Sequence, residues 1–276
     1  MNINKIIKNL KIYDSTLIRF KEVEKNYKYY LRLLDTLSKE NLALFLEVIK
    51  QEEITYNQKM EGESNLLIEM DKLAYETNSI SYLAKIINDK EPFNLNNVKK
   101  LHHLVIRGTI DDKIKNYDYR KRDIKVGRIV DGKEVISYIP PEHKDVIPLV
   151  VKVLNFLNED DSKLFDNIFL KPLIAHVLLA IIQPFGNGNT RLARLIQYGK
   201  ILDLTNQKYK TNFKLPTFYL SDNYMKNKGY RNKIGTLANS MHNDDWDDWF
   251  KYNIILIEEQ LFYLSSQIPK IKNKRI

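Results

Sequence analysis

The sequence predicts an all-α protein, a bundle of helices that carries one small β-hairpin. Over most of the 276 residues, apolar side chains recur at intervals of three and four positions, and few glycines interrupt them. This spacing places the apolar side chains on one face of a helix. Residues 123–143 differ, because β-branched residues are frequent there and Asp131-Gly132 is a typical two-residue turn. We therefore expect a hairpin over residues 124–139 that lies on the helical body.

The ends of several helices can be predicted. Asn94 is a candidate N-cap, and Gly108 a candidate stop, for an amphipathic helix between them. The stretch "KPLIAHVLLAII" is apolar on nearly all sides, with Pro172 tolerated in its first turn and Pro184 forcing its end. Such a helix is expected at the centre of the fold. Acidic residues in "DDWDD" indicate the first turn of a long C-terminal helix.

The chain is expected to divide into three stretches. Residues 1–53 form an N-terminal helical region, residues 54–255 the main domain with the hairpin, and residues 256–276 the end of the last helix with a basic tail. The sequence contains no internal repeat, low-complexity tract or Pro/Ser-rich linker. One helical body with a β flap is therefore the simplest organisation.

Composition limits the classes of function. With 43% hydrophobic residues, the chain can bury a full-sized core. No apolar run approaches the ~18 residues that span a bilayer, and the first residues lack the apolar stretch of a signal peptide, so we expect a cytoplasmic protein without a membrane partner. The chain has no cysteine, which excludes disulfides and thiolate nucleophiles. A net charge of +9 favours anionic partners.

A Gly/Asn loop between two predicted helices has the chemistry of an anion site. In "QPFGNGNTRLAR", residues 183–194, Gly186 and Gly188 allow a tight turn and close approach of the backbone to a ligand. The helix that follows begins with unpaired amides, which favour negative charge. Arg191 and Arg194 share a helix face, and guanidinium groups match phosphate oxygens. The alternative is a plain turn between core helices, with the arginines paired to acidic side chains.

The same stretch resembles the signature loop of Fic (Fic/Doc) domains, whose usual form is His-Pro-Phe-x-Asp/Glu-Gly-Asn-Gly-Arg-x-x-Arg. His176 stands seven residues before the motif, as a histidine commonly does in that family. Tyr119-Arg120 before the hairpin, "SYIPPEHKDVIPLV" after it and "FYLSDNYMKNKGY" further on also resemble family segments in the expected order. The resemblance covers roughly residues 55–255.

The resemblance implies a Fic-type helical bundle and transfer of AMP from ATP to a hydroxyl of a target protein. It implies that Asn189 helps to hold the nucleotide phosphates and that the two arginines neutralise them. The residues implied to bind nucleotide are Gly186, Gly188, Asn189, Thr190, Arg191 and Arg194. The resemblance further implies a homodimer and a target chain that docks on the 124–139 hairpin by strand addition.

A second segment, "NQKMEGES", resembles the inhibitory helix of Fic proteins, Ser/Thr-x-x-x-Glu-Gly/Asn. Glu61-Gly62 matches this pattern, whereas Asn57 stands where the family has a hydroxyl residue. The resemblance implies that Glu61 pairs with Arg194 and crowds the position of the γ-phosphate. The alternative is an exposed helical glutamate.

Three residues of the loop depart from the family pattern. Gln183 replaces the histidine that takes the proton from the attacking hydroxyl, and a neutral amide cannot accept a proton at about pH 7. Asn187 replaces the acidic residue that helps to hold Mg²⁺, and an amide oxygen is a weaker ligand than a carboxylate, so metal binding is disfavoured. Thr190 replaces a glycine, and its side chain either narrows the cradle or donates to an oxyanion.

We therefore expect a Fic-like protein that binds ATP but has lost or strongly reduced AMP transfer. One alternative is an active nucleotidyl- or phosphotransferase in which Gln183 only positions the hydroxyl. Another is a nucleic-acid-associated regulator, which the basic charge allows; the sequence after Tyr263 is too short for a winged-helix domain, so nucleic acid is the weaker expectation.

The five histidines are not expected to supply the missing base or a metal site. His176 lies about two turns before the loop in a buried helix, so we interpret it as a core histidine with satisfied hydrogen bonds. The remaining histidines show no metal-ligand spacing with acidic residues; they are His102, His103, His143 and His242.

Overall fold

The structure, a computed structural model, describes residues 1–60, 70–107, 118–159, 166–227 and 229–272. Its elements are α1 (Ile3–Asn9), α2 (Asp14–Leu34), α3 (Lys39–Met60), α4 (Met70–Asn88), α5 (Leu95–Ile106), β1 (Val126–Val130), β2 (Lys133–Tyr138), α6 (Val146–Asn158), α7 (Leu170–Ile182), α8 (Asn189–Tyr209), α9 (Ser221–Lys226), α10 (Tyr230–Ser240) and α11 (Asn243–Lys272). Helices dominate, and β1 and β2 form a two-stranded sheet. The predicted fold class is confirmed.

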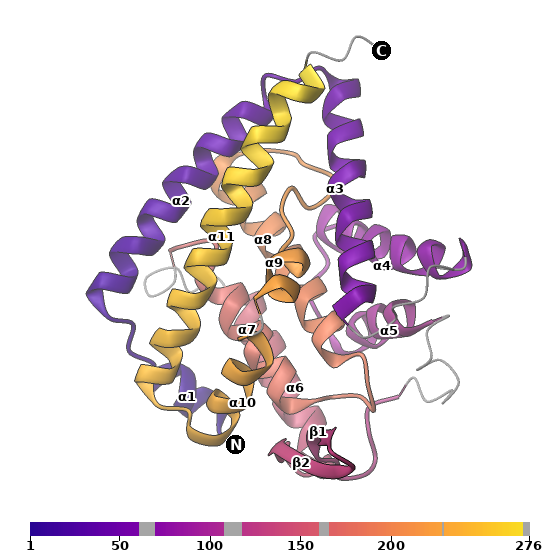
Figure 1. Cartoon of the computed structure of the whole chain (residues 1–276), viewed down its shortest axis with the longest axis vertical. Helices are drawn as coiled ribbons and strands as arrows, with labels where there is room; N and C mark the ends of the chain where they lie inside the picture. The colour runs from indigo at the N-terminus through magenta and orange to yellow at the C-terminus, as the bar shows by residue number, and fades with distance from the viewer. Residues whose placement is uncertain (61–69, 108–117, 160–165, 228, 273–276) are drawn as a thin grey trace.

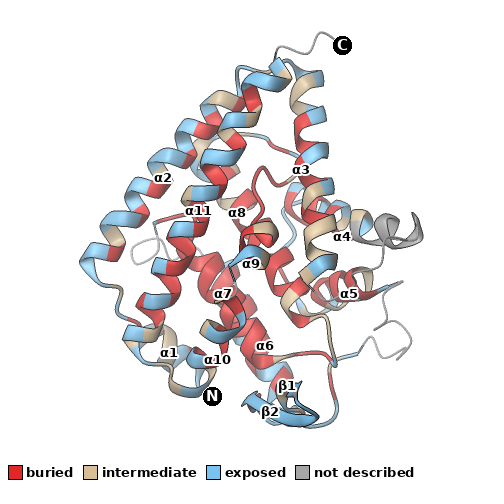
Figure 2. Cartoon of the chain, viewed as in Figure 1, coloured by how far each residue is buried: buried red, intermediate tan, exposed pale blue. Residues whose placement is uncertain are grey.

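Helix α7 lies at the centre of the fold (Figure 1), where α6 and α8 pack against it. Every residue of α7 is buried, so the helix is red along its length in Figure 2. Pro172 lies in the first turn, and the helix ends at Ile182, two residues before Pro184. It ends there because a proline ring excludes the helical conformation of the residue before it. The prediction of a buried central helix is confirmed.

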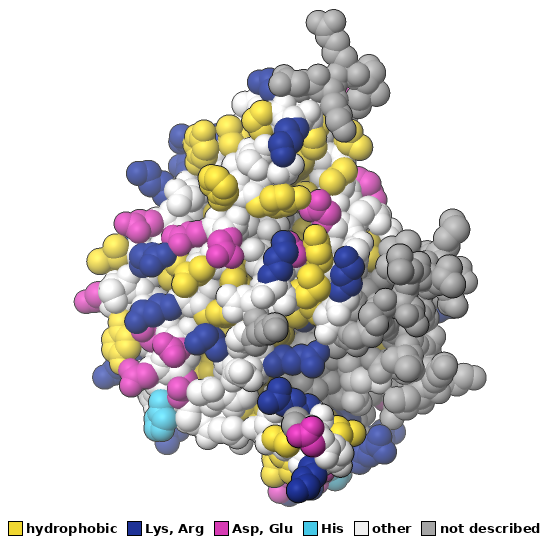
Figure 3. Space-filling view, viewed as in Figure 1, with side chains coloured by type: hydrophobic (Ala, Val, Ile, Leu, Met, Phe, Trp, Pro, Cys, Tyr) yellow, Lys and Arg dark blue, Asp and Glu magenta, His cyan; other side chains and the backbone are white. Residues whose placement is uncertain are grey.

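Helices α2 and α11 lie side by side along one edge of the molecule (Figure 1). Phe20 of α2 meets Phe250 of α11 edge-on, with ring centroids 5.7 Å apart. On this face Lys and Arg side chains are interspersed with Asp and Glu (Figure 3). The predicted boundaries after residues 53 and 255 fall inside α3 and α11, which continue through them. The division into three stretches stays a prediction.

The hairpin forms where the sequence predicts it. Val130 pairs with Lys133 across the turn, and Asp131 and Gly132 have φ values of 50° and 74°. Positive φ at both central residues is typical of the type I′ turn, whose twist matches that of the strands. The hairpin lies on the body through Asn239 of α10, whose Nδ2 donates to Ser137 O at 2.9 Å.

The predicted helix starts are also confirmed. Asn94 caps α5 in a reciprocal capping box with Asn97, and Asp244 and Asp245 lie in the first turn of α11. Helix α5 ends at Ile106; the candidate stop Gly108 lies outside the described residues. Among the helices of the described ranges, none combines the length and the apolar character that crossing a membrane requires.

Candidate functional site

The loop between α7 and α8 is held in shape by Arg120. Gln183 closes α7 in the left-handed conformation, with φ 49° and ψ 64°. The guanidinium of Arg120 donates from Nε to Gln183 O at 2.8 Å and from Nη2 to Ile182 O at 3.3 Å. The backbone N–H of Arg120 donates to Pro184 O at 2.9 Å. One buried arginine therefore satisfies the last carbonyl of α7 and that of its C-cap residue, which have no partner within the helix.

Asn189, the first residue of α8, closes the loop from the other side. Its Oδ1 accepts the N–H of Phe185 at 2.9 Å, and its Nδ2 donates to Phe185 O at 3.0 Å and to Gln183 Oε1 at 2.7 Å. The side chain therefore faces into the loop and fixes its two ends. The phosphate contact implied for Asn189 stays a prediction, and this loop contact is an additional role that the sequence did not reveal.

The side chain of Gln183 is fully engaged by its surroundings. Its Nε2 donates to Ala180 O at 2.8 Å and lies 3.2 Å from the hydroxyl of Tyr138, while its Oε1 accepts from Asn189. Burial raises the pKa of Tyr138 well above its usual value, so this hydroxyl stays protonated. Neither group can serve as a base near neutral pH.

His102 of α5 packs against the α7–α8 loop and contacts its backbone, a role that sequence reasoning missed. Its ring stacks on Phe185 with centroids 3.7 Å apart and planes 5° from parallel. Its Nε2 lies 2.9 Å from Asn187 O and donates to it as the neutral tautomer. Burial lowers the pKa of His102 to about 4. Its spacing could have indicated that His102 is buried, since it shares a helix face with Val98 and Val105.

Gly188 shows how closely the loop approaches α5. It has φ 64°, and a Cβ at this position would lie 2.4 Å from Cγ2 of Ile106. Any side chain here would both strain the backbone and collide with α5. Gly186 is exposed, and a Cβ there would meet no protein atom within 4 Å, so packing within the described residues requires glycine at Gly188 and not at Gly186.

The two arginines of the motif are buried side by side on α8. Arg191 and Arg194 are each 1% exposed. Arg194 donates from Nε to Asn57 Oδ1 at 3.0 Å, and its Nη2 contacts the same oxygen. Arg191 Nη1 lies 3.4 Å from Val105 O. Asn57, which stands where the family has a hydroxyl residue, therefore supplies a side chain that binds Arg194.

Helix α3 fills the space in front of the arginines. Glu53, one turn before Asn57, accepts hydrogen bonds from Ser221 Oγ at 2.6 Å and from Ser221 N at 3.2 Å. The cavity that remains beside Asn57, Arg191 and Tyr198 has a volume of about 10 Å³, room for about one water molecule. Among the described residues, this part of the site therefore leaves little free space beside the two arginines.

Burial raises the pKa of Glu53 to about 7, although Ser221 and the charge of Arg194 pull it down. A carboxyl whose pKa is raised on folding stabilises the fold below its unfolded pKa and loses that contribution as the pH rises through the folded value. We therefore expect the free energy of unfolding of Glu53→Gln, relative to that of the parent, to rise by roughly 2 kcal/mol between about pH 5 and 7. Urea unfolding at a series of pH values measures this difference. A difference that does not vary with pH would contradict it.

The remaining predicted residues lie as follows. Thr190 is half-buried in the first turn of α8, and Asn187 is half-buried with its carbonyl against His102. Glu61 lies outside the described residues, so its inhibitory role stays a prediction. His176 is confirmed as a core histidine: Nε2 lies 2.6 Å from the hydroxyl of Tyr230, and Nδ1 contacts Gln197. Among the described residues, no cluster of His, Asp and Glu is able to hold a metal.

Fold and site together define a class of protein: a helical bundle in which a buried central helix, a Gly/Asn loop and two buried arginines form a candidate anion site. Residues 92–198 match the model of the Fic/DOC family, so the chain is similar to this family over that range. No curated protein matches the chain significantly.

Solved structures of Fic proteins share the fold. A Fic domain containing signaling protein from Bacteroides thetaiotaomicron matches 93% of this chain and 100% of its own, with a TM-score of 0.68 and 15% identity. Fic-1 (aa134 - 508) from C. elegans matches 93% of this chain and 72% of its own, with a TM-score of 0.59 and 13% identity. A Fic family protein from Desulfovibrio desulfuricans matches 94% of this chain and 74% of its own, with a TM-score of 0.53 and 16% identity. At these identities the likeness concerns the fold.

Proposed function

We propose that this Fic-domain protein binds the phosphates of ATP at the α7–α8 loop and has lost or strongly reduced AMP transfer to a target hydroxyl. The observation that carries the proposal is the state of Gln183, which stands at the place of the family histidine. Its amide donates to Ala180 O and accepts from Asn189. An amide held in this way can orient a hydroxyl but cannot take its proton, and loss of a general base costs about 10²- to 10⁴-fold in rate.

The two guanidinium groups support a phosphate ligand. Arg191 and Arg194 are nearly inaccessible to solvent, and both lie within the first two turns of α8. A polyphosphate would receive charge-assisted hydrogen bonds from them together with the favourable field of the helix N-terminus. A phosphate that contacts Arg194 would compete with its hydrogen bond to Asn57.

Magnesium fits this site poorly. The position of the family's acidic ligand is Asn187, a neutral amide whose backbone carbonyl is engaged by His102. Mg²⁺ in nucleotide sites is held mainly by carboxylates and phosphate oxygens. We therefore derive no step through a metal, and expect the arginines to supply the charge that a metal supplies elsewhere.

The hairpin supports docking of a target chain. Ile129 is 79% exposed, and the side chains of Val135 and Ile136 are also exposed. Strand addition along the free edge of such a hairpin would pair the backbone of a visiting chain and cover these side chains. An active transferase in which Gln183 only positions the hydroxyl is the alternative function.

Labelling with tagged ATP separates the two functions. We expect the parent to bind ATP without labelling itself or lysate proteins, whereas Gln183→His combined with Glu61→Gly labels them. Adding Arg194→Ala to that double variant is the matched control and should abolish labelling, because the phosphate contact is lost. Labelling by the parent would favour the active transferase. A double variant that neither binds nor uses ATP would contradict the phosphate site.

A further inference from the structure

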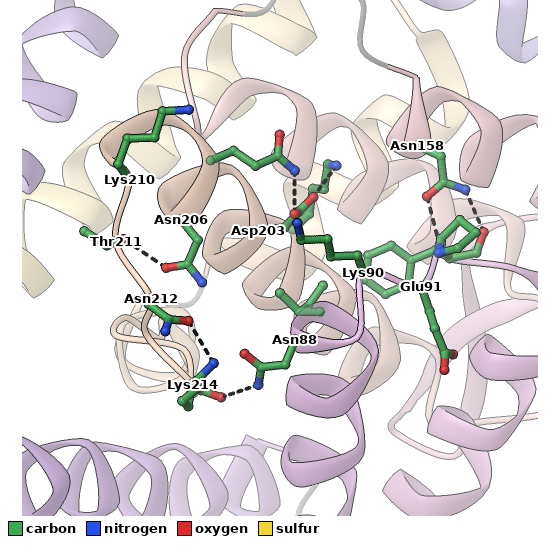
Figure 4. A pocket seen from close by; sticks show the side chains of 15 residues that line it. Asn88, Lys90, Glu91, Asn158, Asp203, Asn206, Lys210, Thr211, Asn212 and Lys214 are labelled. Carbon is green, nitrogen blue, oxygen red and sulfur yellow. Dashed lines mark hydrogen bonds and ion pairs between the residues drawn. The ribbon is translucent and has the colours of Figure 1, made fainter.

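A second cavity lies at the opposite end of α8 from the loop. Its volume is about 700 Å³, within the ~300–1,000 Å³ of small-molecule sites. Its walls are the end of α4 with residues 89–93, the last turns of α8, and residues 210–214 (Figure 4). The 21 residues of α8 span about 30 Å at ~1.5 Å per residue. This cavity is therefore separate from the candidate nucleotide site.

The cavity carries an excess of positive charge. Asp203 is neutralised inside the wall: Lys200 Nζ lies 2.7 Å from its Oδ2, and Gln207 Nε2 donates to its Oδ1 at 2.6 Å. In the ranges that the structure describes, the three other lysines form no ion pair; they are Lys90, Lys210 and Lys214. Glu91, the second carboxylate of the lining, points away from Asp203 and Asn206 in Figure 4. Four lysines against two carboxylates leave the lining with a net charge of +2, which attracts an anion.

The walls of the cavity are fixed in place by amide side chains. Asn88 Nδ2 donates to Lys214 O at 3.2 Å, which joins α4 to the 210–214 segment. Asn206 Oδ1 accepts from Thr211 Oγ1 at 2.9 Å, and Asn158 holds the backbone of Phe93 through bonds of 3.0 and 2.7 Å. Phe93 itself is 4% exposed. The site is thus formed in advance, with polar walls and one aromatic ring in its lining.

Two of the three lysines are held in an unusual backbone conformation. Lys90 and Lys210 both have φ 55°. Glycine usually takes this place after a helix, and a residue with a Cβ costs about 1–2 kcal/mol there. A cation at a helix C-terminus offsets part of this cost through the dipole. Here both strained positions also place an ammonium-bearing side chain at one cavity.

We propose that this cavity binds a small organic phosphate that carries hydroxyl groups, such as a sugar phosphate. Lys90, Lys210 and Lys214 surround the phosphate, since ammonium groups bind phosphate as point charges. The amide oxygens of Asn88 and Gln207, which accept no hydrogen bond within the described residues, offer acceptors to the hydroxyls, and the ring of Phe93 contacts the carbon skeleton. This proposal is independent of nucleotide binding at the loop.

Glycine variants test the site without endangering the fold. Lys90→Gly with Lys210→Gly removes two ammonium groups and relieves the backbone, so the melting temperature should not fall. We expect calorimetric titration with ribose 5-phosphate at low salt to show saturable binding to the parent, and binding at least about tenfold weaker in the double variant. Lys25→Ala, an exposed lysine of α2, is the matched control and should bind as the parent does.

Two further arms locate the ligand and define its class. Arg194→Ala, which disables the loop site, should leave the affinity for ribose 5-phosphate unchanged. Inorganic phosphate should bind at least about tenfold more weakly than ribose 5-phosphate, because it cannot use the amides or Phe93. Equal affinity in the double glycine variant, loss of binding in Arg194→Ala, or an absence of saturable binding would overturn the site. Equal affinity for inorganic phosphate would overturn the hydroxyl-bearing class.

Discussion

Replacing Arg120 by alanine is expected to lower the free energy of unfolding by about 3–5 kcal/mol and to loosen the α7–α8 loop. Arg120 is 4% exposed and makes hydrogen bonds only to backbone carbonyls in the described part of the chain. They belong to four residues from three stretches of chain: Arg122, Pro141, Ile182 and Gln183. Without the guanidinium these buried carbonyls lose their donors, and each unsatisfied group costs about 1–3 kcal/mol.

Urea unfolding, with the same probe for each protein, measures this effect. Arg120→Lys keeps the charge but cannot reproduce a planar fork of donors, so it should recover only part of the loss. Arg122→Ala is the matched control, because its side chain is exposed and should change stability by less than about 0.5 kcal/mol. A loss below about 1 kcal/mol for Arg120→Ala would show that water replaces the guanidinium and that the loop does not depend on it.

Arg120 also shows where sequence reasoning stops. The sequence placed it beside Tyr119 in a family-like segment but suggested no role, because three of its four carbonyl partners are about 20 to 60 residues away in the chain. Every residue has a backbone carbonyl, so the sequence does not indicate which carbonyls a distant arginine will contact. Features set by neighbouring residues were predicted well by contrast: the cap at Asn94, the end of α7 before Pro184, and the Asp131-Gly132 turn all depend on local geometry.

The same distinction holds in the candidate site. The motif fixed the positions of Arg191 and Arg194 on one helix, because their spacing is local. Glu61, the expected partner of Arg194, lies outside the described residues, so that pairing stays a prediction; among the described residues, Asn57 contacts Arg194. Asn57 is far from Arg194 in sequence, and only the packing of α3 against α9 and the arginines brings them together. Glu53 was missed for the same reason, since the spacing of residues along an amphipathic helix does not distinguish a buried glutamate from a solvent-exposed one.

The lysines of the second cavity illustrate a further limit. Lys90, Lys210 and Lys214 are separated by up to 124 residues in a chain with 44 lysines and arginines. In the sequence they therefore cannot be distinguished from the other scattered positive charges. Their convergence is set by the way the ends of α4 and α8 meet. Composition therefore predicted an anionic partner in general but could not place it.

Acidification is expected to destabilise the fold through two buried histidines. Burial lowers the pKa of His102 to about 4 and that of His176 to about 3, with smaller contributions from nearby arginines. The unfolded chain binds protons at both residues below about pH 6.5, whereas the folded chain keeps them neutral. Their contribution to stability is complete above that pH and is lost as the pH falls. Each histidine should cost roughly 3 kcal/mol of unfolding free energy between about pH 7 and 4.

Glu53 acts in the opposite direction over the same range, so the experiment uses the Glu53→Gln background. In that background we expect the unfolding free energy to fall by about 2.7 kcal/mol per pH unit between about pH 6 and 4.5. After His102→Asn, only one of the two histidines still titrates, so the slope should be about 1.4 kcal/mol per pH unit. His242→Ala, an exposed histidine, is the matched control. Proton uptake on unfolding at about pH 5 gives a reading that needs no histidine variant and should reach about two protons from these residues. A slope that His102→Asn leaves unchanged would mean that His102 is protonated within the fold, and a charged ring could not stay stacked in a dry contact with Phe185 without an anion beside it.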